Sequence, residues 1–151
     1  MAVAKALGAS RIIGVDIIPS RLDFAKKYAA THTYLPLAPE EGEGKTEYSR
    51  RNAADMKKQL GITDRGSGGI DLVIDASGAE ASIQTGLYIA KSGGTFVQVG
   101  GGFLFFMFLS SNPLYTQVGM GNHNVTMNIS LIITKELNYK GSFRYGVSLQ
   151  G

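Results

Sequence analysis

The sequence contains no cysteine and no tryptophan, and it has only two histidines among its 151 residues. Without cysteine the chain has no disulfide, no thiolate metal site and no cysteine nucleophile. The two histidines, His32 in a predicted strand and His123 in a polar loop, are too few for a histidine-rich metal site. We therefore expect no metal ligands in this sequence.

Charge of one sign and long apolar runs are also scarce. Fifteen basic residues against twelve acidic ones give a net charge of +3, and the basic residues are dispersed, so we predict no nucleic-acid-binding face. No window approaches the roughly eighteen uncharged apolar residues of a membrane span. The first apolar stretch is too short for a signal peptide. We expect a cytoplasmic protein without a nucleic-acid or membrane partner.

The spacing of apolar residues predicts alternating helices and strands. The predicted helices cover residues 1–9, 21–30, 47–60, 82–91 and 130–136. The predicted strands cover residues 11–16, 31–37, 70–75, 95–99 and 137–145. Ser20 is the expected N-cap of the second helix, and the apolar run at 70–75 is typical of a strand buried on both faces. Alternation with short polar connections predicts a doubly wound α/β fold with a parallel sheet.

The sharpest functional feature is Asp16, an acid at the end of a predicted strand, with Arg21 in the first turn of the next helix. In a dinucleotide-binding sheet, a carboxylate at this place accepts both hydroxyls of the adenosine ribose and repels a 2′-phosphate, which selects NAD over NADP. Alternatively, Asp16 interacts with the helix dipole and Arg21 is a solvated surface charge. Taken alone, the two residues favour this second interpretation.

Other polar residues at strand ends give weaker signals. Ser77 beside Gly78 has no histidine in a recognisable triad relation, so close approach of the backbone to a cofactor is the better interpretation. Asp71 and Asp75 share one predicted strand and are interpreted as strand-end acids, not as an acid/base pair.

Five segments in order carry a family resemblance. They are residues 2–9 (AVAKALGA), 14–22 (GVDIIPSRL), 71–80 (DLVIDASGAE), 94–100 (GTFVQVG) and 140–146 (KGSFRYG). In these segments the chain resembles the zinc-containing polyol dehydrogenases of the medium-chain dehydrogenase/reductase superfamily, most closely the fungal xylitol and sorbitol dehydrogenases. The resemblance implies hydride transfer from a secondary alcohol of a sugar alcohol to NAD⁺, with zinc polarising the alkoxide, in an enzyme that can be a homo-oligomer.

The resemblance also implies roles for individual residues. Asp16 and Arg21 match the adenosine-binding acid and arginine of the family. The two segments that approach the nicotinamide match Val118, Gly119 and Met120, and Ser142, Phe143 and Arg144. The pair that reaches toward the polyol substrate matches Arg144 and Tyr145. Neither histidine matches a zinc position of the family.

The chain departs from the family at its start, because Met1 falls inside the first helix of the coenzyme domain. We therefore expect a partial NAD-binding domain over residues 1–151, without the zinc catalytic domain, and inactive as written. The fold would be an incomplete doubly wound, Rossmann-type parallel sheet that lacks its first strand and Gly-rich turn. The strands at 11–16 and 70–75 would then lack their shared neighbour. They would pair with each other, recruit residues 103–109, or stay open.

A second departure is internal. Gln98-Val99-Gly100 recurs nineteen residues later as Gln117-Val118-Gly119, and four of the seven phenylalanines fall within residues 103–108. We interpret residues 99–117 as a translated intron, since the ends of this segment are compatible with GT and CAG splice sites. We interpret the tail at 147–151 in the same way. The alternative is a genuine apolar loop or a membrane-contact hairpin. For the whole chain, the alternative to an enzyme fragment is a non-catalytic Rossmann-like interaction or dimerisation module.

Overall fold

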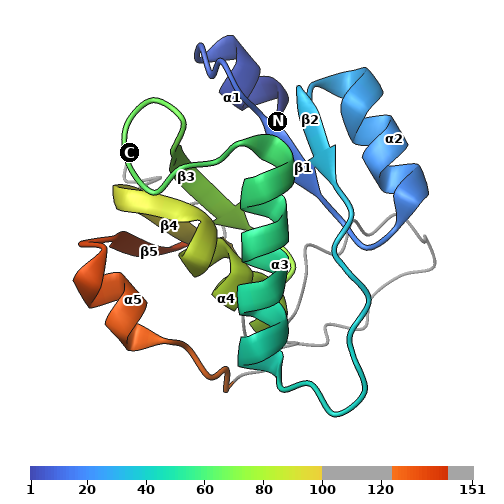
Figure 1. Cartoon of the computed structure of the whole chain (residues 1–151). Coiled ribbons are helices and arrows are strands. Elements are labelled where there is room, and N and C mark those ends of the chain that lie inside the picture. Colours follow the sequence, from blue (N-terminus) through green and yellow to red (C-terminus); the bar gives the residue numbers. More distant parts are fainter. Residues whose placement is uncertain (100–123, 143–151) are drawn as a thin grey trace, which may run out of the picture. The chain divides into compact units, whose positions relative to one another are not determined.

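The computed structural model describes residues 1–99 and 124–142, and the chain divides into two compact units, Met1–Gly42 and Glu43–Gly151. Helices and strands alternate along both units (Figure 1), and every paired strand is parallel to its neighbour. The predicted α/β class and parallel pairing are therefore confirmed. Residues 100–123 and 143–151, which include most of the suspected insert and the suspected tail, lie outside the described residues.

The first unit is a single βαβ motif preceded by a short helix. It contains α1 (Ala2–Ala6), β1 (Ile13–Val15), α2 (Pro19–Tyr28) and β2 (His32–Tyr34). The strands pair in register from Ile13 opposite His32 to Val15 opposite Tyr34. The Thr31 hydroxyl accepts a hydrogen bond from the Ile12 amide (2.8 Å) and donates one to the Ile12 carbonyl (3.0 Å). These two bonds fix the start of β1 against the residue that precedes β2.

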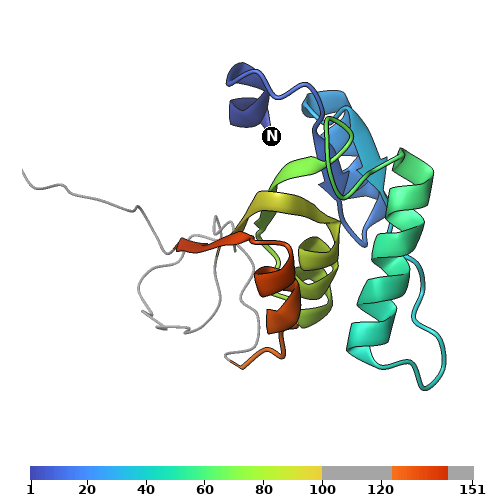
Figure 2. The ribbon, with the colours of Figure 1, turned by 60° about the vertical axis from the view of Figure 1, so that its left-hand side comes forward.

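The second unit contains a three-stranded sheet in the order β3-β4-β5. Its elements are α3 (Lys45–Leu60), β3 (Ile70–Asp75), α4 (Glu80–Ile89), β4 (Ala90–Val99), α5 (Ile129–Thr134) and β5 (Asn138–Ser142). Figure 2 shows α4 and α5 on the same side of this sheet. The core on that side is built from Ile83, Leu87, Ala90, Phe96 and Leu137.

Close packing between α4 and the sheet depends on Gly86. A Cβ atom at this position would lie 2.6 Å from Phe96 Cε2 and 3.0 Å from Val73 Cγ1. The fully buried Phe96 ring also stacks on Tyr139 of β5, with 5.2 Å between ring centroids. The absence of a side chain at Gly86 therefore leaves room for the Phe96 ring between α4 and the sheet.

Two local predictions were wrong. Helix α2 begins one residue before Ser20, at Pro19, and its N-cap is Ile18. The reason is that the fixed φ of proline suits the first helical position, where no amide hydrogen is needed. Strand β3 is not buried on both faces, since Leu72 and Ile74 are 50% and 58% exposed. The core cluster packs on the opposite face of β3, which bears Val73.

Within the described residues, one edge of β1 and one edge of β3 stay open, which is one of the three outcomes expected from the sequence. There, β1 pairs only with β2, and β3 pairs only with β4. The recruitment of residues 103–109, another of those outcomes, concerns residues that are not described. An edge of this kind presents unpaired amide and carbonyl groups.

Candidate functional site

Polar side chains mark the carboxyl ends of the strands in both units. Asp16 directly follows β1, Asp75 ends β3, Gln98 is the penultimate residue of β4 and Ser142 ends β5. In open α/β sheets, ligands bind outside the carboxyl ends of the strands. Within each unit, these positions are therefore the places where a ligand is expected.

The geometry at Asp16 suits a hydroxyl-binding carboxylate. Its Oδ1 accepts a hydrogen bond from the Ile18 amide at 2.9 Å, which fixes the direction of the side chain. Its Oδ2 lies 3.6 Å from Arg21 Nη1, and the two side chains are 29% and 68% exposed. A pair this exposed contributes little to stability. Since a carboxylate offers about four acceptor positions, Asp16 retains room for two hydroxyl donors.

The Asp75 carboxylate is the centre of a buried hydrogen-bond network, and the residue is 4% exposed. Its Oδ1 accepts hydrogen bonds from the hydroxyls of Ser77 (2.8 Å) and Ser82 (2.6 Å). Its Oδ2 accepts from the Gly78 amide (2.9 Å) and from Gln98 Nε2 (2.7 Å). The neighbouring strand acid, Asp71, differs because it is exposed and pairs with Lys91. Both acids were interpreted from the sequence as strand-end acids, and the structure shows that only Asp75 is buried.

Tyr139 reports the polarity around this network. Burial raises the pKa of the Tyr139 phenol, and the negative charge of Asp75 raises it further. Tyr139 lies opposite Phe96 of β4, two pairs before Gln98 and Gly141. Nothing in this arrangement makes Ser77 a nucleophile, because its hydroxyl donates to Asp75 and accepts from the Ala79 amide.

The remaining predicted site residues are only partly within the described chain. Ser142 is exposed at the end of β5, opposite Val99 of β4. His32 lies in β2, where its Nδ1 is 2.9 Å from the Thr31 hydroxyl. The predicted positions outside the described residues are Val118, Gly119, Met120, His123, Phe143, Arg144 and Tyr145. The described residues thus bring Asp16 and Arg21 together and place Ser142 at a strand end.

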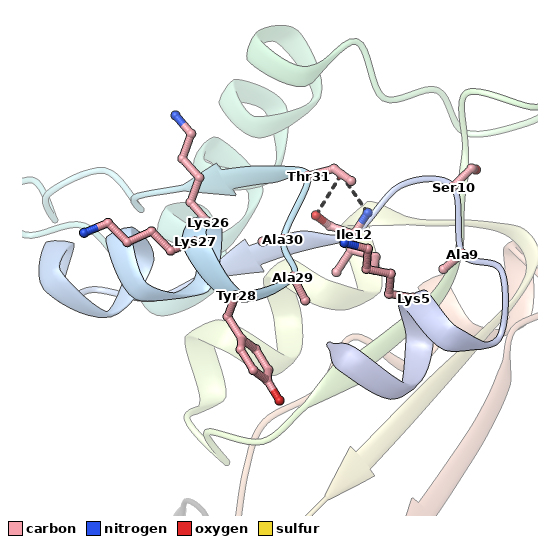
Figure 3. Close-up of a pocket in the computed structure, with 10 residues that line it drawn as sticks. All are labelled: Lys5, Ala9, Ser10, Ile12, Lys26, Lys27, Tyr28, Ala29, Ala30 and Thr31. Carbon is pink, nitrogen blue, oxygen red and sulfur yellow. Dashed lines mark hydrogen bonds between the residues drawn. The ribbon is translucent and has the colours of Figure 1, made fainter.

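A cavity of about 280 Å³ lies elsewhere in the first unit (Figure 3). It is lined by residues of α1 and of the last turn of α2, together with Ile12, which precedes β1, and Thr31, which precedes β2. Lys26 and Lys27 border it, but in Figure 3 their side chains extend away from Ile12. Because Ile12 precedes β1 and Asp16 follows it, this cavity lies at the opposite end of the strand from the candidate site.

The described residues do not fit a zinc ion. Among residues 1–99 and 124–142, no group of three or more histidine, aspartate or glutamate side chains is placed to hold a metal. In the same part of the chain, no helix combines the length and apolar character needed to cross a bilayer.

Comparisons with known proteins agree with this arrangement. The sequence model of a family described as zinc-binding dehydrogenase matches residues 1–150. D-xylulose reductase A of Aspergillus niger is 44% identical over 146 residues, which cover 96% of this chain and 32% of the relative. This chain therefore spans about a third of the length of that relative.

Solved structures share the fold. L-idonate 5-dehydrogenase of Escherichia coli K-12 aligns with a TM-score of 0.61 and 22% identity, over 95% of this chain and 31% of its own. A zinc-binding dehydrogenase of Sinorhizobium meliloti 1021, solved bound to NADP, aligns with a TM-score of 0.58 and 21% identity over 93% and 32%. The Rossmann-type dehydrogenase fold predicted from the sequence is confirmed.

Sequence reasoning missed the roles of Gln98 and Ser82. Each donates a hydrogen bond to Asp75, and Gln98 does so from 23 residues away. The sequence contains a local signal only for the partners close to Asp75. An aspartate that is followed by a Ser-Gly pair, with another serine at the start of the next helix, often accepts hydrogen bonds from the turn that follows it.

Proposed function

The chain belongs to the zinc-binding dehydrogenase family, and we propose that it forms part of the coenzyme-binding domain of an NAD-dependent polyol dehydrogenase. The reaction would transfer a hydride from a secondary alcohol carbon of a sugar alcohol, such as xylitol, to NAD⁺, release the proton of the hydroxyl group and leave a ketose. The observation that carries the proposal is Asp16, held at the end of β1 by the Ile18 amide and beside Arg21.

Asp16 would select the coenzyme through its charge. Its carboxylate accepts hydrogen bonds from the 2′ and 3′ hydroxyls of the adenosine ribose, and such charge-assisted bonds contribute about 1.5–3 kcal/mol each. A 2′-phosphate would bring a second negative charge to about 4 Å, which costs up to about 4 kcal/mol at an effective dielectric constant of 20. Arg21 would offset part of this repulsion. The net result favours NAD⁺ over NADP⁺.

The rest of the site follows from the matched motifs. Two segments would line the nicotinamide end: Val118, Gly119 and Met120, and Ser142, Phe143 and Arg144. Arg144 and Tyr145 would reach toward the polyol. Residues 99–117 and 147–151 would lie outside the pattern of the family, and the zinc ligands would come from a domain that this chain does not match. The enzyme would be cytoplasmic, and the family resemblance allows a homo-oligomer.

A hybrid enzyme tests this function. In it, residues 1–98 and 118–146 of this chain replace the matching third of the Aspergillus niger D-xylulose reductase, which supplies the remainder. We expect the hybrid to reduce NAD⁺ when given xylitol or sorbitol, and the 151-residue chain alone to be inactive under the same conditions. A correctly folded hybrid that turns over no polyol would refute the proposal.

The second candidate, a non-catalytic dimerisation module, is favoured by the open edges of β1 and β3 in the described residues and by the exposed Leu72 and Ile74. Such surfaces attract a partner strand or sheet. Sedimentation of the purified chain separates the two candidates. A monodisperse dimer that binds no nucleotide would support the module.

A further inference from the structure

The buried Asp75 network lies at the strand ends where the proposed coenzyme site is built, but it is arranged differently from a ligand site. All four acceptor positions of the carboxylate are already occupied by donors of this chain. With 4% exposure, Asp75 has no free face to offer a coenzyme. Its role must therefore be exerted through the groups that it holds.

Among the described residues, only neutral donors hold the buried Asp75 carboxylate. None of the ion pairs between described residues involves Asp75. A buried carboxylate held only by neutral donors is costly to desolvate. In return, hydrogen bonds to a charged acceptor are stronger than neutral ones, and the four bonds here are 2.6–2.9 Å long. The arrangement therefore gives a rigid local geometry.

The groups fixed by Asp75 come from three pieces of the chain. Ser77 and Gly78 form the turn after β3, Ser82 lies in the first part of α4, and Gln98 is near the end of β4. Gln98 is in register with Asp75 on one side and with Gly141 of β5 on the other.

Through this register, the Asp75–Gln98 hydrogen bond also affects Ser142, a predicted site residue. The next pair along β4 and β5 joins Val99 to Ser142. Fixing Gln98 thus fixes the last pair of β4 and β5, which includes Ser142. A dinucleotide at the carboxyl edge of this sheet would depend on that geometry, because small misplacements of binding groups cost reactivity steeply.

We propose that Asp75 is a positioning residue for the nicotinamide end of the coenzyme site, acting through Gln98 on the ends of β4 and β5. This inference rests on the proposed function, and it assigns no contact between Asp75 and the coenzyme. It differs from a purely structural role in one respect. Loss of the Asp75–Gln98 bond should affect the nicotinamide end of the site and leave the adenosine end unchanged.

Three variants separate these roles. Asp75→Ala removes all four bonds, and Gln98→Met removes, of these four, the one that reaches β4, while keeping a side chain of similar length. Lys135→Met is the matched control, because Lys135 Nζ bonds the carbonyls of Tyr88 and Ala90 at the amino end of β4 and lies in no proposed site. Each variant weakens the same unit, and only the first two do so at the carboxyl edge.

The first measurement is backbone amide hydrogen exchange on the 151-residue chain, which needs no coenzyme. In Gln98→Met we expect exchange to be about tenfold faster at residues 98–99 and 141–142 than in the parent, a change that corresponds to the loss of one hydrogen bond. Lys135→Met should accelerate exchange near residues 90–93 instead. Unchanged exchange at residues 98–99 and 141–142 in both Asp75→Ala and Gln98→Met would overturn the inference.

The second measurement uses the hybrid enzyme. We expect Gln98→Met to lower kcat/KM for NAD⁺ about tenfold while the inhibition constant of ADP, which probes only the adenosine end, stays within twofold. Lys135→Met should change neither quantity. If ADP binding weakens as much as NAD⁺ use, or if kcat/KM is unchanged, the positioning role is wrong and the proposed function stands. A parent hybrid without activity would refute the proposed function and this inference with it.

Discussion

Replacing Lys135 by methionine should destabilise the second unit. The side chain is only 14% exposed, and its ammonium group donates to Tyr88 O at 2.7 Å, Ala90 O at 2.8 Å and Asp64 Oδ1 at 3.1 Å. The two carbonyls lie at the end of α4 and the start of β4. Lys135 therefore supplies donors to carbonyls that the helix itself leaves unpaired.

The size of the effect follows from these contacts. Leaving a buried carbonyl without its donor costs about 1–3 kcal/mol, and removal of the desolvated ammonium returns part of that. Methionine keeps the apolar stem, so packing is retained. We expect a net loss of about 2–4 kcal/mol in the free energy of unfolding, or roughly 6–12 °C in Tm at about 3 °C per kcal/mol.

Urea unfolding followed by circular dichroism measures this loss. Lys58→Met is the matched control, since Lys58 is an exposed residue in the last turn of α3 and should change stability by less than about 0.5 kcal/mol.

The stability of the parent should also depend on pH. Burial lowers the pKa of Lys135 below its ordinary value of 10.5, and between the lowered pKa and 10.5 the unfolded chain binds more protons than the folded one. The parent should therefore gain stability relative to Lys135→Met as pH rises through this range. Equal unfolding free energies for the two methionine variants would refute the reasoning.

Three further predictions concern packing, pH and the suspected insert. Gly86→Ala should cost about 1–3 kcal/mol because its Cβ would overlap Phe96, and an unchanged Tm would contradict this packing. Burial raises the pKa of Asp64, but hydrogen bonds from Lys57 and Lys135 outweigh it and hold the pKa below 3.8, so the parent should lose stability relative to Asp64→Asn as pH falls below 3.8. If the stabilities of the parent and Asp64→Asn fell in parallel as the pH was lowered, this prediction would be wrong. Deleting residues 99–117 should raise the soluble yield, and a less soluble variant would count against a non-native insert.

Strand β3 could be predicted to the residue because its signals are local. The apolar run begins after Gly69 and ends before a Ser-Gly turn, and the structure places the strand at Ile70–Asp75. The start of α2 was misplaced for an equally local reason, since the cap preference of Ser20 yields to the fixed φ of Pro19. Local chemistry therefore sets where elements begin and end.

Exposure and long-range contacts were beyond the sequence pattern. Leu72 and Ile74 were expected to be buried, yet burial depends on what packs against a face, and hydrophobic periodicity does not contain that information. The Asp75–Gln98 bond joins residues 23 positions apart, and it forms because β3 and β4 pair in one particular register. Asp16 and Arg21, by contrast, are only five residues apart, and a single strand–helix turn brings them together.

The ratio of kcat/KM for NAD⁺ to that for NADP⁺ in the hybrid enzyme, with Asp16 intact and as Asp16→Ala, tests the central claim most directly. We expect a strong preference for NAD⁺ that falls at least tenfold in Asp16→Ala, because the variant loses both the ribose hydrogen bonds and the repulsion of a 2′-phosphate. Equal efficiency with the two coenzymes before mutation, or a preference unaffected by Asp16→Ala, would contradict the assignment of the adenosine site to the end of β1.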